Sequence, residues 1–234
     1  MPVTPDAAQA PDIEALREAL YRDGIVGMPG ALPASWADEL RVDFDRAFAA
    51  ARSYPEGTIS RGPNRFYFAV PPERIRGFVD LVTHPLVMAL STAVCGSGYQ
   101  FVELAFDVPL PGAVDQPWHR DFRMPPATRQ DGRLDSLAFN ATTVDVAADM
   151  APFEIAPGTH WDLGDTFAHG MFPPASDTGR YDALGSRRYP RRGDLSARTG
   201  LTVHRGTANL SPHTRAVLIL GVVSSDVDPR DIEV

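Results

Sequence analysis

The sequence predicts an α+β protein in which helices come first and a β sandwich or barrel follows them. Two observations lead to this prediction. Apolar residues recur at helical spacing in the first 94 residues, and from Gln100 onward they alternate with polar residues as they do in strands. With 234 residues, the chain has the length of a single β domain and can bury a sizeable core without disulfides.

Three segments have the pattern of amphipathic helices, at residues 12–22, 35–51 and 85–94. Asp12 can cap the first of these helices, and Gly24 can end it. The second helix carries a stripe of mostly aromatic residues at helical spacing, which favours a core-facing side over a cofactor site. The third helix begins with a proline, which suits the first helical turn.

Period-two alternation predicts the strands. The clearest strand spans residues 102–108, where four apolar residues alternate with Glu103, Ala105 and Asp107. Shorter apolar runs bounded by turn residues predict the other strands, at residues 25–28, 137–146, 153–156, 201–204 and 216–223.

Two segments lack such periodicity. Residues 1–11 are rich in proline and alanine and are expected to be a disordered N-terminal segment. Residues 165–200 are rich in Gly, Pro, Asp and Arg, and they have the length and composition of a long loop. Such a loop would be either a lid over a site or a solvated insertion far from the chemistry.

Charge and cysteine content limit the class of protein. The formal charge is −8, which argues against nonspecific binding to nucleic acid or to anionic membranes. Cys95 is the only cysteine, so no intramolecular disulfide can form, and a cytoplasmic setting is expected. No apolar run reaches membrane-spanning length, and the N-terminus lacks the order of a signal peptide.

The residues with catalytic potential lie far apart in the sequence. His119 and Asp121 are separated by one residue, His204 follows 85 residues after His119, and Arg215 comes 11 residues later. Two histidines and a carboxylate on one side of an iron are the ligand set of non-heme Fe(II) oxygenases. A nearby arginine can grip a carboxylate co-substrate through paired hydrogen bonds. Because these residues must share one core, residues 12–234 are expected to form one oxygenase domain.

Each candidate also has a structural interpretation. A second His-x-Asp pair, His160 and Asp162, competes with the first, although its place after a Pro-Gly-Thr turn favours a loop-shaping role. His204 could instead be a hydrogen-bonded core histidine. Arg215 could be a surface residue at a strand edge, but it needs an anionic partner if it points inward.

The chain resembles the phytanoyl-CoA dioxygenase family of Fe(II)/2-oxoglutarate oxygenases over most of its length. The similarity lies in residues 23–30, 118–121, 153–160 and 204–215. The last segment is the most specific, because family members carry His, Asn, Ser and Arg in a similar order at this spacing.

This resemblance implies a mainly β fold, a double-stranded β-helix or jelly-roll barrel, with the N-terminal helices packed on it and iron at its mouth. It implies His119, Asp121 and His204 as ligands of Fe(II), and Arg215 as the partner of the distal carboxylate of 2-oxoglutarate. Of the three iron positions left, 2-oxoglutarate would take two and O2 the last. Related halogenases lack the carboxylate ligand, so the presence of Asp121 favours hydroxylation or another oxidation.

Further residues are candidates for contacts with the co-substrate or the substrate. Asn140 and Thr142 share one face of an apolar strand, which favours contacts with 2-oxoglutarate unless the strand is a half-exposed edge. The family places Arg61 and Arg65 near the substrate mouth, and Arg120 flanks the iron motif. These arginines favour an anionic group on a small-molecule substrate, and pairing with the chain's own acids is the alternative.

We therefore expect an Fe(II)- and 2-oxoglutarate-dependent oxygenase that hydroxylates or otherwise oxidises a C–H bond of a small molecule. Specialised metabolism or amino-acid modification would be its setting. One rival is a metal-binding isomerase or epimerase with the same barrel, which would not need Arg215 for 2-oxoglutarate. Another is a catalytically silent barrel that acts as a binding module and would tolerate loss of a metal ligand.

Overall fold

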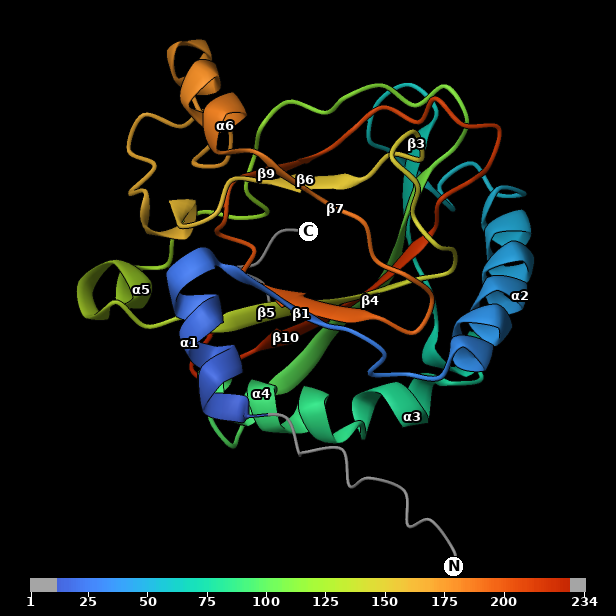
Figure 1. The fold of residues 1–234 in the computed structure, drawn as a ribbon, viewed down its shortest axis with the longest axis horizontal. Coiled ribbons are helices and arrows are strands. Elements are labelled where there is room, and N and C mark those ends of the chain that lie inside the picture. The colour runs from blue at the N-terminus through green and yellow to red at the C-terminus, as the bar shows by residue number, and fades with distance from the viewer. Residues whose placement is uncertain (1–11, 228–234) are drawn as a thin grey trace, which may run out of the picture.

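The computed structural model describes residues 12–227, in which two antiparallel sheets face each other (Figure 1). Residues 1–11, predicted to be disordered, and residues 228–234 of the predicted domain lie outside the described part. Within that part, the larger sheet has seven strands, in the order β1 (Ile25–Met28), β8 (Leu195–Arg198), β5 (Ser136–Thr142), β10 (Val217–Val223), β4 (Gln100–Pro109), β3 (Arg65–Ala69) and β2 (Ile59–Ser60). The smaller sheet there has three strands, in the order β7 (Ser186–Arg188), β6 (Phe153–Ile155) and β9 (His204–Gly206).

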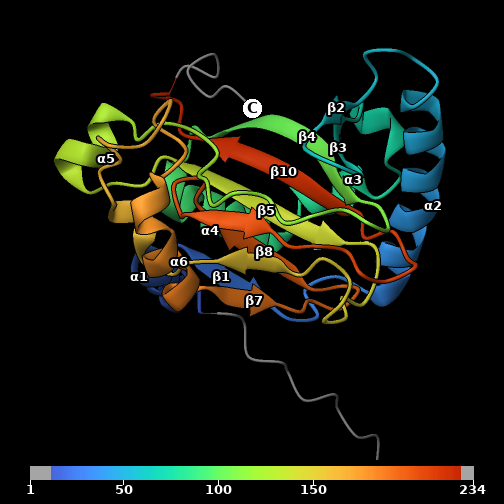
Figure 2. The same cartoon turned by 90° about the horizontal axis from the view of Figure 1, so that it is seen from above.

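Helices surround the larger sheet on its outer side and at its ends. Figures 1 and 2 place α2 at one end of the molecule and α1, α5 and α6 at the other. The bounds of the helices are α1 (Ile13–Asp23), α2 (Ala34–Ala51), α3 (Phe78–Val82), α4 (Pro85–Cys95), α5 (Pro126–Asp131) and α6 (Thr178–Leu184), with 3-10 turns at η1 (Pro72–Arg74), η2 (Thr159–Trp161) and η3 (Ala175–Asp177). None of the helices within residues 12–227 has the length and hydropathy to cross a membrane.

Alternation along the strands separates the core from a cavity. In β10, Leu218 and Leu220 point into the apolar core under the helices, whereas Val217 and Ile219 line the space between the sheets. Helix α4 contacts both β5 and β10 from the core side. The sheet therefore has one apolar face toward the helices and one face available for a site.

The helix signals in the sequence correspond to real caps. The Asp12 side chain accepts a hydrogen bond from the Ala15 N–H at 3.1 Å and begins α1. Gly24 ends this helix with φ 77°, and a Cβ at Gly24 would come within 2.1 Å of Thr202 Oγ1. Both the backbone conformation and the close approach of Thr202 thus require glycine. The predicted fold class, strands in antiparallel sheets with N-terminal helices packed on them, is confirmed, although β1, β2 and β3 precede α4.

Residues 165–200 are not the long loop that their composition predicted. They contain α6, β7 and β8, and β8 is paired on both sides, with β1 and with β5. A single lid over the whole segment is therefore wrong for its last part. A four-residue strand among Gly, Pro and Arg carries little periodicity of its own, and its partners are distant in the sequence.

Two predicted strands have different bounds in the structure. The strand predicted at residues 201–204 is wrong, because His204 begins β9 instead of ending a strand. The N–H of Thr202 closes a turn, and the N–H of Val203 binds a threonine hydroxyl, so neither joins a sheet. The strand predicted at 137–146 ends at residue 142, since the chain turns there.

Candidate active site

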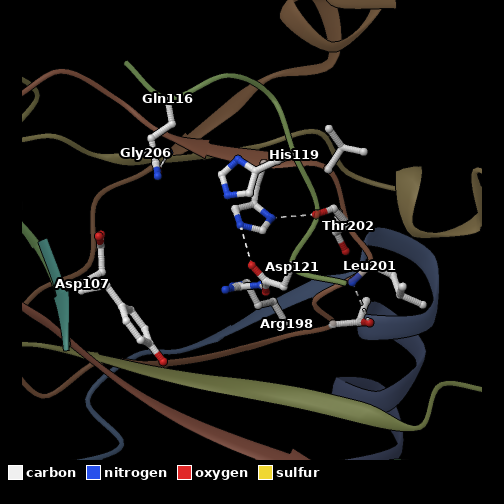
Figure 3. Close-up of polar contacts among 12 residues, drawn as sticks. Asp107, Gln116, His119, Asp121, Arg198, Leu201, Thr202 and Gly206 are labelled. Atoms are coloured by element: carbon white, nitrogen blue, oxygen red, sulfur yellow. Dashed lines mark hydrogen bonds and ion pairs between the residues drawn. The ribbon is translucent and has the colours of Figure 1, made fainter. Parts of the chain in front are cut away.

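Three side chains able to hold a metal ion meet between the two sheets. His119 and Asp121 follow β4 on a loop, and His204 begins β9. Their metal-binding atoms all lie within 4.8 Å of one another. Two backbone hydrogen bonds join the histidines, from His119 N–H to His204 O at 2.9 Å and from His204 N–H to His119 O at 2.7 Å. This pairing brings together residues that are distant in the sequence, and Figure 3 shows His119 and Asp121 on the same side of the site.

Both imidazole rings are held by backbone carbonyls. His119 Nδ1 donates to Pro117 O at 2.8 Å, and His204 Nδ1 donates to Thr202 O at 2.8 Å. Because a carbonyl oxygen only accepts, each Nδ1 carries the proton and each Nε2 keeps a lone pair. Metal-binding histidines usually have their second nitrogen fixed in this way.

The carboxylate of Asp121 divides its two oxygens between two partners. Oδ1 lies 3.3 Å from His204 Nε2, and Oδ2 accepts a hydrogen bond from Arg198 Nη1 (Figure 3). Arg198 belongs to β8 and is almost fully buried. A Cβ at Gly200 would lie 3.0 Å from Asp121 Oδ2, so this glycine leaves room for the carboxylate. The carboxylate is therefore fixed by the larger sheet while its other oxygen faces the histidines.

The surroundings set the protonation state that a metal requires. Burial, together with the neighbouring His204, lowers the pKa of His119 to about 4. Burial alone would raise the pKa of Asp121, but Arg198 and the two histidines hold that pKa far below its usual range. At neutral pH the site offers an uncharged His119 and an ionised carboxylate, which are the forms that bind metal.

The three donors lie beside a cavity of about 600 Å³ between the sheets. Two aromatic rings pack on the histidines, Phe172 at 6.0 Å from His119 and Phe153 at 5.1 Å from His204, measured between ring centroids. Two histidines and a carboxylate on one side, with an open side toward a cavity, fit a divalent iron. This volume is in the range of sites for small organic molecules.

At one end of the cavity two buried arginines surround one carboxylate. Arg215 Nη2 and Arg65 Nη1 each donate to Asp107 Oδ2 at 3.0 Å, and Arg65 Nη2 also donates to Thr207 O at 2.8 Å. The Nε atoms of both arginines are buried and have no partner within the described residues. A Cβ at Gly206 would lie 2.3 Å from the Arg65 guanidinium, so this glycine makes space for it. The cluster has one net positive charge and unused donors, which fit a carboxylate ligand.

The strand residues predicted to contact the co-substrate also face this cavity. Asn140 and Thr142 both lie in the cavity wall on β5, with β10 on one side and β8 on the other, so β5 is not an edge strand. Thr142 Oγ1 donates to Val144 O at 3.1 Å, whereas the Asn140 amide forms no hydrogen bond within the described residues. Asn140 is thus the member of this pair with free polar groups.

The three arginines predicted to contact a substrate have different surroundings. Arg61 is exposed beside the cavity and lies over the Tyr67 ring, 5.0 Å from its centroid. Arg65 is occupied at the Asp107 cluster. Arg120 is buried, donates to Asp162 O at 2.9 Å and stacks on Phe167 at 4.4 Å. Arg120 thus has one nitrogen bonded within the protein, while its Nε and Nη1 have no partner among the described residues.

The competing His-x-Asp pair has structural contacts. His160 is fully buried, and its Nε2 donates to Tyr21 O at 3.0 Å. The carboxylate of Asp162 accepts hydrogen bonds from Arg180 and from the Tyr181 hydroxyl. Among the residues that the structure describes, His119, Asp121 and His204 form the group whose geometry suits a metal ion.

Several cavity residues were not singled out from the sequence. Arg198 lacked a signal because β8 was not predicted. The sequence did contain a signal for Glu103 and Asp107, because in an alternating strand these two residues lie on the same face, opposite the apolar residues. With the apolar face in the core, both acids had to face the site. Tyr67, in contrast, belongs with Arg61 and Arg65 to the segment that the family resemblance places near the substrate mouth, and its hydroxyl donates to Glu103 Oε1 at 2.7 Å.

Several solved structures share this fold. The chain is similar to the epimerase SnoN, solved with Fe3+, alpha ketoglutarate and nogalamycin RO, with a TM-score of 0.72 and 22% identity, covering 91% of this chain and 84% of that one. It is similar to HygX from Streptomyces hygroscopicus, solved with nickel and 2-oxoglutarate, with a TM-score of 0.68 and 14% identity, covering 90% of this chain and 87% of that one. It is also similar to the alpha ketoglutarate dependent carbocyclase SnoK from nogalamycin biosynthesis, with a TM-score of 0.69 and 19% identity, covering 95% of this chain and 88% of that one. None of the curated proteins matches the chain in sequence.

The jelly-roll barrel and the His-Asp-His group together define an enzyme of the Fe(II)- and 2-oxoglutarate-dependent class, as the sequence predicted. The sequence profile of the phytanoyl-CoA dioxygenase (PhyH) family matches residues 20–217, and the chain belongs to this family.

Proposed function

We propose that this protein is an Fe(II)- and 2-oxoglutarate-dependent dioxygenase that hydroxylates or otherwise oxidises a C–H bond of a small molecule. The observation that carries the proposal is the convergence of His119, Asp121 and His204 at a cavity that ends in Arg215. In this proposal residues 12–234 act as one catalytic domain. A cytoplasmic location stays a prediction, which rests on the presence of a single cysteine in the sequence.

His119 and His204 would bind iron through Nε2, and Asp121 through Oδ1. The carbonyl partners at Nδ1 keep the rings oriented, and Arg198 keeps the second carboxylate oxygen away from the metal. Bound iron, with 2-oxoglutarate and O2, supplies the oxidising chemistry that removes hydrogen from a C–H bond. The task of the chain is to position the reactants and exclude water.

Arg215 would hold the distal carboxylate of 2-oxoglutarate, with the Asn140 amide as a further donor in the wall of the same cavity. Thr142 would shape the wall of the co-substrate site without donating to the co-substrate, because its hydroxyl proton is bonded to Val144 O. The aromatic side chains of Phe153 and Phe172 make the metal side of the cavity apolar, which limits the access of water. Arg61 is the predicted arginine left free to meet an anionic group of the substrate.

The second candidate function is a 2-oxoglutarate-dependent epimerisation or ring closure in specialised metabolism. It is favoured by the similarity to SnoN, an epimerase, and to SnoK, a carbocyclase, which share the fold. The two functions use the same cofactors and differ in the product. A hydroxylated product is heavier than the substrate by one oxygen atom, whereas an epimer has the mass of the substrate and a cyclised product is lighter by two hydrogens.

The test begins with anaerobic titration of the protein with Fe(II) and 2-oxoglutarate, followed through the visible charge-transfer band of the complex. The variants Asp121→Asn and Asp162→Asn are a matched pair, because each removes one carboxylate charge from a His-x-Asp motif. We expect loss of the band in Asp121→Asn alone. Exposure to O2 should then release succinate. A band that depends on Asp162, or 2-oxoglutarate that does not bind, would contradict the proposal.

A further inference from the structure

One acid of the cavity wall has a single hydrogen bond and no ion pair within the described residues. Within residues 12–227, Glu103 forms no ion pair, and its only hydrogen bond comes from the Tyr67 hydroxyl. Two of the other acids in the wall are bonded to arginines, and the third accepts backbone N–H groups: they are Asp107, Asp121 and Asp194. Glu103 thus differs from every other carboxylate that lines this cavity in the described chain.

The local geometry fixes one oxygen of Glu103 and leaves the other open. Tyr67 holds Oε1 at 2.7 Å, while Oε2 accepts no hydrogen bond from the described residues. Across the sheet, a Cβ at Gly221 would come within 2.7 Å of the Glu103 Cβ and 2.9 Å of Oε2. The glycine therefore provides the space in which this carboxylate lies. An oriented carboxylate with a free oxygen is a ready acceptor for a donor group of a ligand.

Strand register places Glu103 at the level of the metal ligands. Glu103 pairs with Gly221, Gly221 with Ala138, and Ala138 with Arg198, whose guanidinium binds Asp121. The Asp107 cluster lies four residues farther along the same strand, roughly 14 Å away at the usual rise per residue. Co-substrate held at Arg215 would occupy that end, so Glu103 borders the space that remains for the substrate.

Burial makes the charge of Glu103 unfavourable without a partner. Burial and the nearby Asp121 raise the pKa of this carboxyl, and the Tyr67 hydrogen bond, Arg198 and Arg61 oppose the shift only in part. Arg61 stacks on the Tyr67 ring, and Arg198 binds Asp121, so neither of these cations forms an ion pair with Glu103. A cationic donor from a ligand would satisfy the carboxylate, whereas an anionic group would meet repulsion.

We propose that Glu103, held by Tyr67, binds a protonated amino group of the substrate. The substrate class is then a small molecule that carries an amine at the end distant from the co-substrate carboxylate. This inference rests on the proposed function, because it takes the metal-side cavity as the substrate site.

The experiment uses three probes of similar size, namely cyclohexylmethylammonium, cyclohexylmethanol and cyclohexanecarboxylate. Each is titrated by calorimetry into protein loaded with Ni(II) and 2-oxoglutarate, which does not turn over. The parent is compared with Glu103→Gln and with Tyr67→Phe. The control variant is Glu56→Gln, because Glu56 is an exposed glutamate on the surface. We expect the amine to bind the parent and the control at least tenfold more tightly than the alcohol. Glu103→Gln should lose this preference, and Tyr67→Phe should keep it with weaker binding.

The outcomes separate the two proposals. Equal binding of amine and alcohol to the parent, or an amine preference that survives Glu103→Gln, would overturn the role of Glu103. Those results would leave the proposed function intact as long as 2-oxoglutarate binds the nickel protein. Failure of 2-oxoglutarate to bind would instead contradict the proposed function, and the same titrations on the metal-free protein would still decide whether Glu103 selects amines.

Discussion

Replacing Arg215 with alanine should weaken the binding of 2-oxoglutarate strongly and leave metal affinity nearly unchanged. Arg65 and Arg215 carry two positive charges and Asp107 one negative charge, so the cluster has a net charge of +1. That charge matches one carboxylate of the co-substrate. In Arg215→Ala the net charge falls to zero, while Arg65 still holds Asp107, so the fold keeps a partner for this half-buried acid.

Removing one partner of a buried charged pair costs about 2–5 kcal/mol. This corresponds to a dissociation constant for 2-oxoglutarate that is higher by roughly 30-fold to 5,000-fold. The assay is calorimetric titration of 2-oxoglutarate into the nickel-loaded protein, with nickel affinity measured separately. Arg129→Ala is the matched control, because Arg129 is an exposed arginine that pairs with Asp165 on the surface.

The charge argument also predicts how a second substitution behaves. Adding Asp107→Asn to Arg215→Ala returns the net charge of the cluster to +1, carried by Arg65. The double variant should therefore bind 2-oxoglutarate more tightly than Arg215→Ala, by about 1 kcal/mol or roughly fivefold. Unchanged binding in Arg215→Ala, or an equal loss of nickel and 2-oxoglutarate, would refute the reasoning.

Three further predictions concern the metal ligand, its partner and the buried thiol. Asp121→Ala should lose bound iron and product formation together, and hydroxylation at the parental rate would show that another carboxylate serves the metal. Arg198→Met should lower metal affinity about tenfold to a hundredfold, as is usual for a partner of a metal ligand, and metal titration of Arg198→Lys should give an intermediate value. Burial raises the pKa of the Cys95 thiol to about 12, so iodoacetamide should label it at pH 8.5 only after unfolding. The unfolded thiol ionises from about pH 8.5 upward, so the stability that Cys95 contributes should fall as the pH rises from there to about 12. Chemical denaturation of the parent and of Cys95→Ala across this pH range measures the difference.

The sequence was sufficient to predict the parts of the fold that have strong local patterns. The cap residues at both ends of helix α1 could be recognised by residue type, and the long alternation in β4 was recognisable without knowledge of its neighbouring strands. Strand β8 was missed because four residues between turns carry almost no period, and its position is determined by pairing with β1 and β5. Local patterns cannot report pairing between segments that are distant in the chain.

The same limit explains which site residues could be found. His119, Asp121 and His204 were recognisable from residue type, spacing and family resemblance, although the backbone bonds that join the histidines were not. Arg198 depends entirely on β8, and so its contact with Asp121 could not be anticipated. Arg120 lies between two ligands and lines the cavity, so its contact with a substrate stays a prediction, although its side chain also stacks on Phe167.

Strand β4 brings two acids to the same wall of the cavity and gives them opposite surroundings. Asp107 meets two arginines, and the excess positive charge at that end suits the carboxylate of 2-oxoglutarate. Glu103 lies four residues away on the same face, where its one hydrogen bond comes from a tyrosine hydroxyl and it forms no ion pair within the described residues. A molecule with an amine would thus meet Glu103 at the level of the metal ligands, away from the Asp107 cluster. The alternation of one strand would therefore orient both reactants about the metal ligands.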